Sequence, residues 1–323
     1  RKDEMPGKGA PRRRWAGSRN SHWLALTAFG LVALLIIVSG WWGFEHQKID
    51  IREQRQNELK AIATLKAQQI SHWRQEKLND AELLRSNPIL ADQLTEWIEQ
   101  GAPIDDLYLK FRSRLGSILH AYDYHAVALL DSKLNSLLYV GEKWGIGERT
   151  RVTALKALRS RQSLFADLTT QHDAQFSDAD HVHLDLAIPL LHSKTQEAVG
   201  LVVIRLEPEK FLFPLIESWP TPSASAESVL LKAVPGGVIR LSGRRHLNEG
   251  PSRNIKIPED RVTPPLLVLK GQEGVIEHLD YRNVPNISYI KKVENTPWFL
   301  VAKVDQAEIY APINRLARQI VLL

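Results

Sequence analysis

Residues 21–44 read SHWLALTAFGLVALLIIVSGWWGF and contain no Lys, Arg, Asp or Glu. A membrane-spanning helix needs about 20 consecutive, mostly apolar residues, which this stretch provides. Trp23 lies near one end, and Trp41 and Trp42 lie near the other, where indole rings suit the two membrane–water interfaces. No Ala-x-Ala cleavage site follows, which favours a retained anchor over a cleaved signal peptide. The stretch therefore predicts a transmembrane helix in contact with membrane lipid.

The sequence before this stretch is strongly basic. Residues 1–20 hold seven of the 42 basic residues and two of the 37 acidic ones, so they account for the whole net charge of +5. Basic flanks stay on the cytoplasmic side of a membrane. We therefore expect a membrane anchor with the N-terminus in the cytoplasm and the chain from residue 45 onward on the other side of the membrane.

Composition excludes several functional classes. After residue 20 the chain carries 35 basic and 35 acidic residues, and this balance gives no sign of the basic face that nucleic-acid binding requires. There is no cysteine, which excludes disulfides and thiol catalysis. The sequence has no Gly-x-Ser-x-Gly elbow, no His-Glu-x-x-His motif and no phosphate loop. We therefore expect no nucleic-acid partner, no catalytic residue and no cofactor.

A long helix is expected after the anchor. Residues 47–85 contain neither Gly nor Pro, and their apolar residues recur on helical spacing. The pair Asn87-Pro88 ends this helix, because proline pushes the residue before it out of the helical region. The apolar stripe is narrow and rich in Ala, which fits two interpretations: it packs against a sheet of its own chain, or it forms a seam with a second copy in a homodimer.

Residues 88–219 predict helices combined with one antiparallel sheet. Helices are expected at 88–100, from Asp105 or Asp106 to 119, at 151–161 and, as an imperfect connecting helix, at 209–219. Apolar runs and turn signals predict five strands, at 126–130, 136–140, 165–168, 181–191 and 198–206. This order indicates an α+β domain with helices against one face of the sheet.

A Pro- and Ser-rich linker at 220–227 precedes a second, smaller unit. Its five predicted strands cover residues 228–234, 238–242, 274–282, 286–293 and 298–304. Between 244 and 270 lies an irregular, Pro-rich stretch with room for one short helix. Residues 306–318 predict a helix. The apolar residues 320–323 are interpreted as the start of a second transmembrane span in a truncated receptor, and the alternative is a genuine terminus with a short hydrophobic tail.

In this order the predicted elements resemble the double Cache sensor regions of bacterial receptors. The resemblance is closest in the second unit, which carries ESVLL at 227–231, GVIRLS at 237–242, Arg244-Arg245-His246, Asp280-Tyr281-Arg282, and NTPWFLVAKVD at 295–305 followed by Glu308. It implies an α+β fold with a transmembrane helix, a long stalk helix and two tandem, PAS-like, five-stranded antiparallel sheets.

The predicted domains combine the boundaries above with this resemblance, which implies a bacterial inner membrane with both sheets in the periplasm or outside the cell. They are a cytoplasmic tail (1–20), the transmembrane helix (21–44), the stalk (45–87), a membrane-distal Cache domain (88–219), a membrane-proximal Cache domain (220–305), and a return helix with the start of a second span (306–323). The membrane-distal domain is the one expected to bind the ligand.

The resemblance also implies a function. Such regions bind a small molecule in the membrane-distal sheet and pass a shift to a cytoplasmic output domain, such as a histidine kinase or a diguanylate cyclase, which this sequence does not contain. The Arg-x-Trp-Tyr signature of many amino-acid-binding members is absent from residues 126–206. The ligand therefore stays open. The alternative is a ligand-free module that docks a periplasmic partner or holds a dimer together.

The predicted strand at 181–191 carries the first candidate ligand-binding residues. Its side chains alternate, with Leu184, Leu186 and Ile188 on one face and His183 and Asp185 on the other. The apolar face can pack on helices, which turns the polar face toward a pocket. A carboxylate and an imidazole in such a pocket can bind an amine or another polar ligand.

Two aromatic residues near the end of the predicted hairpin complete this candidate site. Tyr139 and Trp144 can form an aromatic wall beside the polar strand face. The alternative is that the strand face is simply solvated and that the two rings pack at its rim. The candidate ligand-binding set is therefore Tyr139, Trp144, His183 and Asp185.

Two further clusters are explained better by structure than by binding. Nitrogen and oxygen donors are dense at Asp178, Asp180, His181, His183 and Asp185. Their spacing matches no established metal motif, so we expect no metal ion. Residues 280–282 at a strand end are interpreted as a hydrogen-bonded turn clamp, with a second pocket as the alternative.

Overall fold

The structure is a computed structural model that describes residues 19–170, 182–235, 237–243, 252–255 and 262–321. The chain divides into two compact units, one made of residues 1–53 and 310–323 and the other of residues 54–309. The second unit contains both β-sheets, and the candidate site therefore lies in it.

The first element is α1 (Arg19–Arg85), one continuous helix that contains both the predicted transmembrane segment and the predicted stalk. Along the apolar segment, large side chains such as Trp23, Phe29 and Leu35 are exposed. Exposed apolar side chains all around a helix are what a lipid environment accommodates. Among the described residues, α1 is the one helix that is long and apolar enough to cross a membrane.

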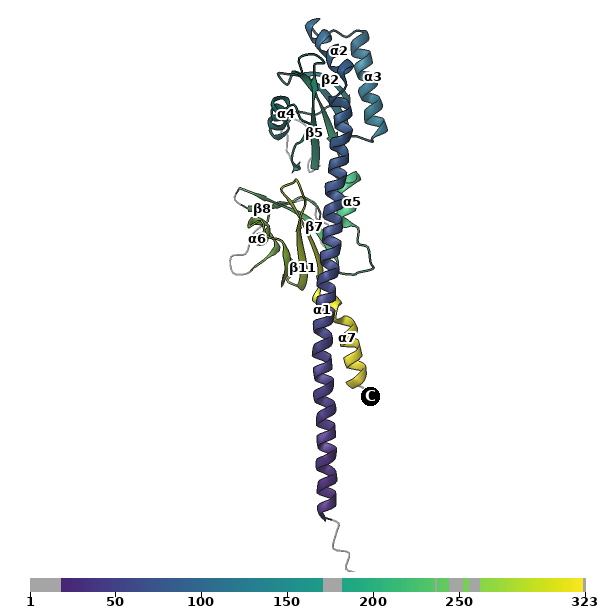
Figure 1. Cartoon of the computed structure of the whole chain (residues 1–323), viewed down its shortest axis with the longest axis vertical. Coiled ribbons are helices and arrows are strands. Elements are labelled where there is room, and N and C mark those ends of the chain that lie inside the picture. Colours follow the sequence, from purple (N-terminus) through teal and green to yellow (C-terminus); the bar gives the residue numbers. More distant parts are fainter. Residues whose placement is uncertain (1–18, 171–181, 236, 244–251, 256–261, 322–323) are drawn as a thin grey trace, which may run out of the picture. The chain divides into compact units, whose positions relative to one another are not determined.

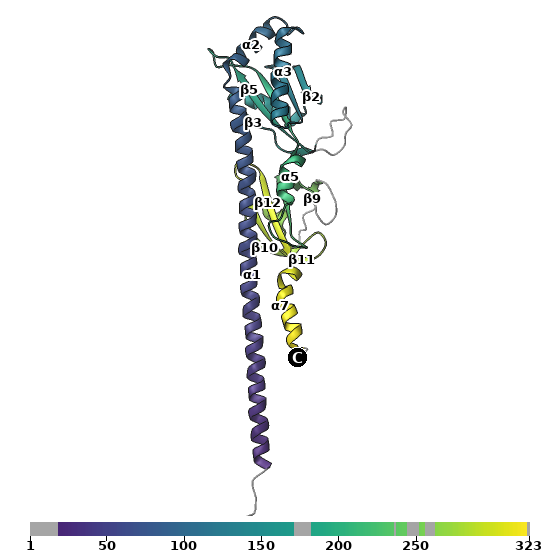
Figure 2. The ribbon, with the colours of Figure 1, turned by 90° about the vertical axis from the view of Figure 1, so that its right-hand side faces the viewer.

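Within the second unit α1 becomes amphipathic. Leu59, Ile70 and Trp73 are buried, whereas Leu65 on the opposite side of the helix is exposed. Figure 2 shows both sheets beside this part of α1. The stalk therefore packs on the sheets of its own chain, which is one of the two interpretations of its apolar stripe.

The helix ends follow local capping rules. α2 (Pro88–Glu99) begins after Asn87, whose side-chain oxygen accepts the amide of Leu90. Proline occupies the first position of α2, where a missing N–H costs nothing. α3 (Asp106–Ala121) is capped by Asp105, whose carboxylate accepts the amides of the second and third residues of the helix. These boundaries lie within a few residues of the predicted ones.

The first sheet contains six strands: β1 (Ala126–Asp131), β2 (Ser136–Gly141), β3 (Leu164–Phe165), β4 (Thr169–Thr170), β5 (Val182–Leu191) and β6 (Ala198–Leu206). Five of them follow the antiparallel order β2-β1-β6-β5-β3, and β4 pairs with β5 beside this path. The single strand predicted at 165–168 is wrong in detail, because β3 and β4 flank that segment and leave residues 166–168 between them.

Helices cover both faces of the first sheet, whereas the sequence predicted helices on one face. On one face, Ala154 and Ala157 of α4 (Glu148–Ser160) pack with Ala128 and Ala187 of the strands. On the other face, Gly200 of β6 lies directly against Leu94 of α2. Figure 1 shows α4 on one side of the strands and α2 and α3 on the other.

Two short elements connect the sheets in place of the single helix predicted at 209–219. They are a 3-10 turn, η1 (Pro208–Lys210), and α5 (Leu212–Glu217). The break falls at Phe211, whose φ of −133° lies outside the helical region. Its ring stacks on Trp73 of α1, with 5.3 Å between the centroids. The aromatic contact therefore holds the connection against the stalk.

A buried lysine fastens the stalk to the end of α5. Lys66 of α1 donates from Nζ to the carbonyl of Ile216 at 2.5 Å, to Ser228 Oγ at 2.9 Å and to the carbonyl of Ser218. Carbonyls at a helix C-terminus carry partial negative charge and suit a cation. Burial lowers the pKa of Lys66 to about 8, against the opposing effect of the Glu217 charge.

The second sheet contains β7 (Glu227–Val234), β8 (Gly237–Arg240), β9 (Ser252–Ile255), β10 (Gly274–Leu279), β11 (Pro285–Lys292) and β12 (Trp298–Asp305). Its antiparallel order is β10-β11-β12-β7-β8-β9. Without β4 and β9, each sheet has five strands. When these are numbered from 1 to 5 along the chain within each sheet, both sheets have the spatial order 2-1-5-4-3. The two predicted five-stranded sheets are therefore present, with β9 as an unpredicted addition.

Two helices complete the chain. α6 (Pro264–Leu269) is a short helix within the irregular stretch 244–270, where the sequence allowed one, and Val268 on it is buried in the core of the second sheet. α7 (Gln306–Val321) follows β12 directly and covers the predicted helix at 306–318. Residues 322–323 of the predicted second span lie outside the described residues.

Candidate ligand-binding site

An ion pair between neighbouring strands lies at the centre of the candidate site. Asp185 of β5 and Arg205 of β6 are directly opposite each other in the antiparallel register. The Nε and Nη2 atoms of Arg205 each donate to one carboxylate oxygen of Asp185 at 2.9 Å. The side chains are 4% and 11% exposed, so this bidentate pair is largely removed from water.

Two aromatic rings form a wall beside this pair. The guanidinium carbon of Arg205 lies 4.7 Å from the centroid of the Trp144 ring, which is a cation–π geometry. Tyr139 meets Trp144 edge to face, with 5.5 Å between the centroids. The structure thus brings three of the four predicted residues together, and Arg205 is the side chain that joins them.

A hydroxyl group from α4 completes the arrangement. Thr150, which is buried, donates from Oγ1 to Asp185 Oδ2 at 2.7 Å. The indole nitrogen of Trp144 is buried and has no hydrogen-bond partner among the residues that the structure describes. An unused indole N–H beside an ion pair can donate to a bound molecule. We call Tyr139, Trp144, Thr150, Asp185 and Arg205 the Asp185 cluster.

The fourth predicted residue, His183, lies beside a different group. Its ring stacks on His125, with 6.1 Å between the centroids. His125 in turn contacts Glu207 through Nδ1 at 2.6 Å and Glu142 through Nε2 at 3.0 Å. His183 shares a strand face with Asp185, as predicted, but the structure places it against this histidine–glutamate group.

The donors that were considered for a metal do not assemble within the described part of the chain. Asp178, Asp180 and His181 lie outside the described residues. Asp185 is engaged by Arg205 and a threonine hydroxyl. Within the described ranges, no group of three or more His, Asp or Glu side chains is arranged to hold a metal ion.

Two members of the cluster, Arg205 and Thr150, were not among the predicted site residues. Arg205 is the one charged residue of β6, and an isolated charge in an otherwise apolar strand is a signal that could have identified it. Thr150 has no comparable signal, because it is a common residue in a helix whose predicted start, at residue 151, excluded it.

No family model matches the chain, and no curated protein matches it. Solved structures are similar. The sensory domain of the Campylobacter jejuni chemoreceptor Tlp3 with isoleucine bound is 11% identical, covering 81% of this chain and 97% of that one, with a TM-score of 0.54. A domain of a sensory box/GGDEF family protein from Vibrio parahaemolyticus is 13% identical, covering 80% and 98%, with a TM-score of 0.54. The ligand-binding domain of the Pseudomonas fluorescens chemoreceptor CtaA in complex with L-serine is 16% identical, covering 79% and 99%, with a TM-score of 0.52.

The similarity spans nearly the full length of these sensory regions, and it agrees with the repeated strand order of the two sheets. The chain has the double Cache fold. The predicted α+β architecture, with a long N-terminal helix and two antiparallel sheets, is confirmed. The Asp185 cluster belongs to the first of the two sheets of this fold.

The second sheet carries its own buried charges, at the turn after β10. Asp280 accepts from Lys303 Nζ at 2.5 Å and from Arg282 Nε at 2.8 Å, and Lys303 also pairs with Glu227 at 3.0 Å. Asp280 further accepts the amides of Arg282 and Val284, which closes the turn. Burial opposes ionisation, but the hydrogen bonds from Lys303 and Arg282 outweigh it and hold the pKa of Asp280 well below its usual value. This geometry fits the clamp interpretation.

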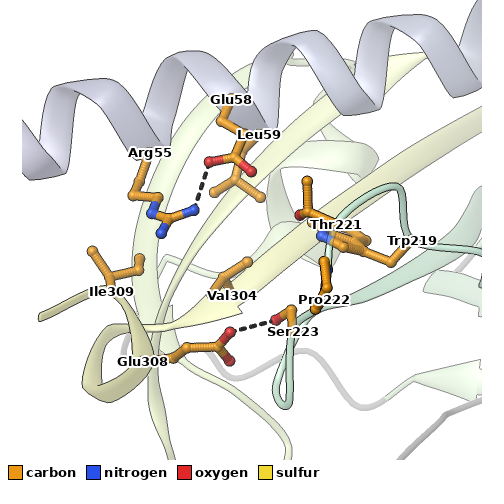
Figure 3. A pocket seen from close by; sticks show the side chains of 10 residues that line it. All are labelled: Arg55, Glu58, Leu59, Trp219, Thr221, Pro222, Ser223, Val304, Glu308 and Ile309. Atoms are coloured by element: carbon orange, nitrogen blue, oxygen red, sulfur yellow. Dashed lines mark hydrogen bonds and ion pairs between the residues drawn. The ribbon is translucent and has the colours of Figure 1, made fainter. Parts of the chain in front are cut away.

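A small pocket lies at the start of α7, and its walls are shown in Figure 3. It is lined by Arg55, Glu58, Leu59, Trp219, Thr221, Pro222, Ser223, Val304, Glu308 and Ile309. Arg55 pairs with Glu58 at 2.7 Å, and Glu308 accepts from Ser223 Oγ at 2.7 Å and from the Ser225 amide at 2.8 Å. Both carboxylates are thus engaged by their own chain, and none of the four predicted residues lines this pocket. The Asp185 cluster is the better candidate.

Proposed function

We propose that this chain is the extracytoplasmic sensory region of a bacterial membrane receptor, and that its first sheet binds a small molecule with a cationic group. The fold supports the sensory role, since the similar Tlp3 and CtaA structures hold isoleucine and L-serine. Transmission to a cytoplasmic output domain belongs to the same proposal. It requires that ligand binding favour one of two conformations.

The choice of a cationic ligand rests on the position of Arg205. Its guanidinium lies between a carboxylate and the face of an indole, with a hydroxyl group on the same carboxylate. A carboxylate and an aromatic face are the groups that recognise a cation. A ligand amine or guanidinium can take the place of Arg205 and keep the charge of Asp185 balanced. An anion would instead have to displace Asp185 from Arg205, and Asp185 is a short side chain that Thr150 also holds.

Thermal unfolding of the full chain with small cations tests this proposal. The probes are agmatine, putrescine and methylguanidine, and methylurea is the neutral counterpart of methylguanidine. We expect at least one cation to raise the melting temperature, because a ligand at 100 times its Kd stabilises by about 2.7 kcal/mol. Asp185→Asn should abolish that shift, since it removes the charge but keeps the shape.

The controls decide between binding and a general effect. Asp123→Asn changes an exposed carboxylate of the same sheet domain, 79% exposed and paired with Lys210, and should retain the shift. An equal shift with methylurea, or a full shift in Asp185→Asn, would contradict a cation site at Asp185. A chain that no member of the panel stabilises would favour the ligand-free docking module.

The membrane orientation and the dimer are part of the same proposal. The basic N-terminal tail supports a cytoplasmic N-terminus. Because the chain has no cysteine, a single one introduced for the exposed Lys110 reports the location of the sheets by labelling from one side. Labelling from the cytoplasmic side alone would exclude a periplasmic sensor. Chemical crosslinking in membranes tests whether two copies pair.

A further inference from the structure

The segment that runs from β3 to β4 contains one residue more than the part of β5 with which it pairs. β3 pairs Phe165 with Leu186, and β4 pairs Thr169 with His183. Three residues, 166–168, therefore lie between these two pairs on one side, whereas two residues, 184 and 185, lie between them on β5. The pairing register therefore shifts by one residue across residues 166–168, the kind of irregularity that a β-bulge produces and that turns a side chain away from the regular strand direction. We call residues 166–168 the bulge.

One side of the bulge is bonded to the residue at the centre of the candidate site. The amide of Ala166 donates to the carbonyl oxygen of Asp185 at 2.7 Å. Ala166 and Leu168 are buried, so this part of the bulge is packed into the first sheet domain. A displacement of the backbone at Asp185 therefore reaches the bulge through a hydrogen bond that is shielded from water.

The other side of the bulge reaches the second sheet. Asp167 accepts from Trp298 Nε1 at 2.9 Å through one carboxylate oxygen and pairs with Lys232 Nζ through the other. Lys232 and Trp298 are opposite each other on β7 and β12, and both are more than nine-tenths buried. The two carboxylate oxygens of Asp167 thus contact the two members of one cross-strand pair of the second sheet, Trp298 and Lys232.

Arg74 of the stalk belongs to the same junction. Its guanidinium carbon lies 5.0 Å from the centroid of the Phe165 ring. Burial lowers the pKa of Arg74, and the nearby Asp167 charge opposes that change. The carboxylate at the tip of the bulge is therefore close to charges from both the second sheet and the stalk.

We infer that the bulge couples the ligand site of the first sheet to the second sheet, with Asp167 as the positioning residue. This inference rests on the proposed function for the assignment of the ligand site. When a ligand displaces Arg205 from Asp185, β5 loses its side-chain tie to β6 at that position. The change in β5 reaches Ala166 through the backbone bond and then Lys232 and Trp298 through Asp167. β12 continues directly into α7, which would carry the change onward.

A mutant cycle without any ligand tests the coupling. Hydrogen–deuterium exchange is measured in the full chain in lipid nanodiscs, for the unmodified protein, Asp185→Asn, Asp167→Asn and the double variant. We expect Asp185→Asn to accelerate exchange in β5 and also, at least about fivefold, in residues 227–234 and 298–305, because site–site coupling free energies correspond to about 5- to 150-fold effects. In the Asp167→Asn background, the same change should accelerate β5 alone.

The non-additivity is the decisive readout, because a merely structural Asp167 would give effects that add. Equal acceleration of the second sheet in both backgrounds would overturn the inference, as would no acceleration in the unmodified background. Trp298→Phe provides a milder variant that removes one donor and keeps an aromatic ring, and it should weaken the propagation. Full propagation in Trp298→Phe would also count against Asp167 as the link.

Two further comparisons distinguish coupling through the bulge from a general loosening of the chain. Asp123→Asn should leave exchange in the second sheet unchanged, since its pair with Lys210 is exposed. Because the cycle uses no ligand, it remains valid if no cation stabilises the chain. Conversely, a cation that binds at Asp185 while the cycle is additive would overturn the coupling and leave the proposed ligand site intact.

Discussion

Lys303→Met is expected to lower the free energy of unfolding of the second sheet by about 3–5 kcal/mol. The ammonium of Lys303 lies between the carboxylates of Asp280 and Glu227, and both carboxylates are 2% exposed. Methionine has a similar length but no charge, so it leaves two buried anions without their shared cation. In a unit of this size, residues 220–305, each kcal/mol corresponds to about 4–8 °C, so the melting temperature measured by circular dichroism in detergent should fall by at least about 12 °C.

A matched variant and a pH series test the cause of this loss. Lys291→Met removes a lysine of the same sheet whose pair with Glu273 is partly exposed, and it should cost less than about 1 kcal/mol.

The depressed pKa of Asp280 contributes stability at neutral pH that is lost as the pH falls below about 4. The difference between Lys303→Met and the unmodified chain should therefore shrink on acidification. A pH-independent difference would indicate lost packing instead of lost charge pairing.

The elements that the sequence predicted well are those decided by local chemistry. Asn87 and Pro88 end one helix and begin the next because of rules that act within a few residues. The order of helices and strands in both domains follows from the same kind of signal, and the structure confirms the α+β fold. β9 was missed because residues 252–255 form a strand only by pairing with β8. Such pairing is a tertiary effect that no window of sequence contains.

In the candidate site, too, local sequence patterns predicted some features, whereas others depend on contacts between distant segments. The alternation along β5 was enough to select Asp185, because the two faces of a strand differ at every residue. Its partner Arg205 follows from the register of β5 against β6, and a shift of one residue would send that arginine to the other face. The separate position of His183 depends on its contact with His125, the residue immediately before β1. Contacts between distant segments were therefore beyond sequence analysis, even where the segments themselves were correct.

Arg205→Ala is expected to destabilise the first sheet by about 3–5 kcal/mol and to create a chain that methylguanidine restores. The substitution removes the guanidinium and leaves Asp185 buried, with Thr150 as its remaining side-chain donor among the described residues. Methylguanidine carries the same planar head group and is small enough to enter the space that the side chain leaves. At 100 times its Kd it should return about 2.7 kcal/mol, seen as a saturable rise in melting temperature.

The rescue must depend on the carboxylate if Asp185 and Trp144 form a cation site. In the double variant Asp185→Asn/Arg205→Ala the buried charge is gone, so methylguanidine should give no stabilisation. Methylurea has nearly the same shape without the charge and should not rescue the single variant. Trp144→Leu in the Arg205→Ala background removes the aromatic face and should weaken the rescue by about 0.5–2 kcal/mol, the range of a cation–π contact. A rise that is equal for methylguanidine and methylurea would mean that the space accepts any small polar molecule, and the assignment of a cationic ligand would then be wrong.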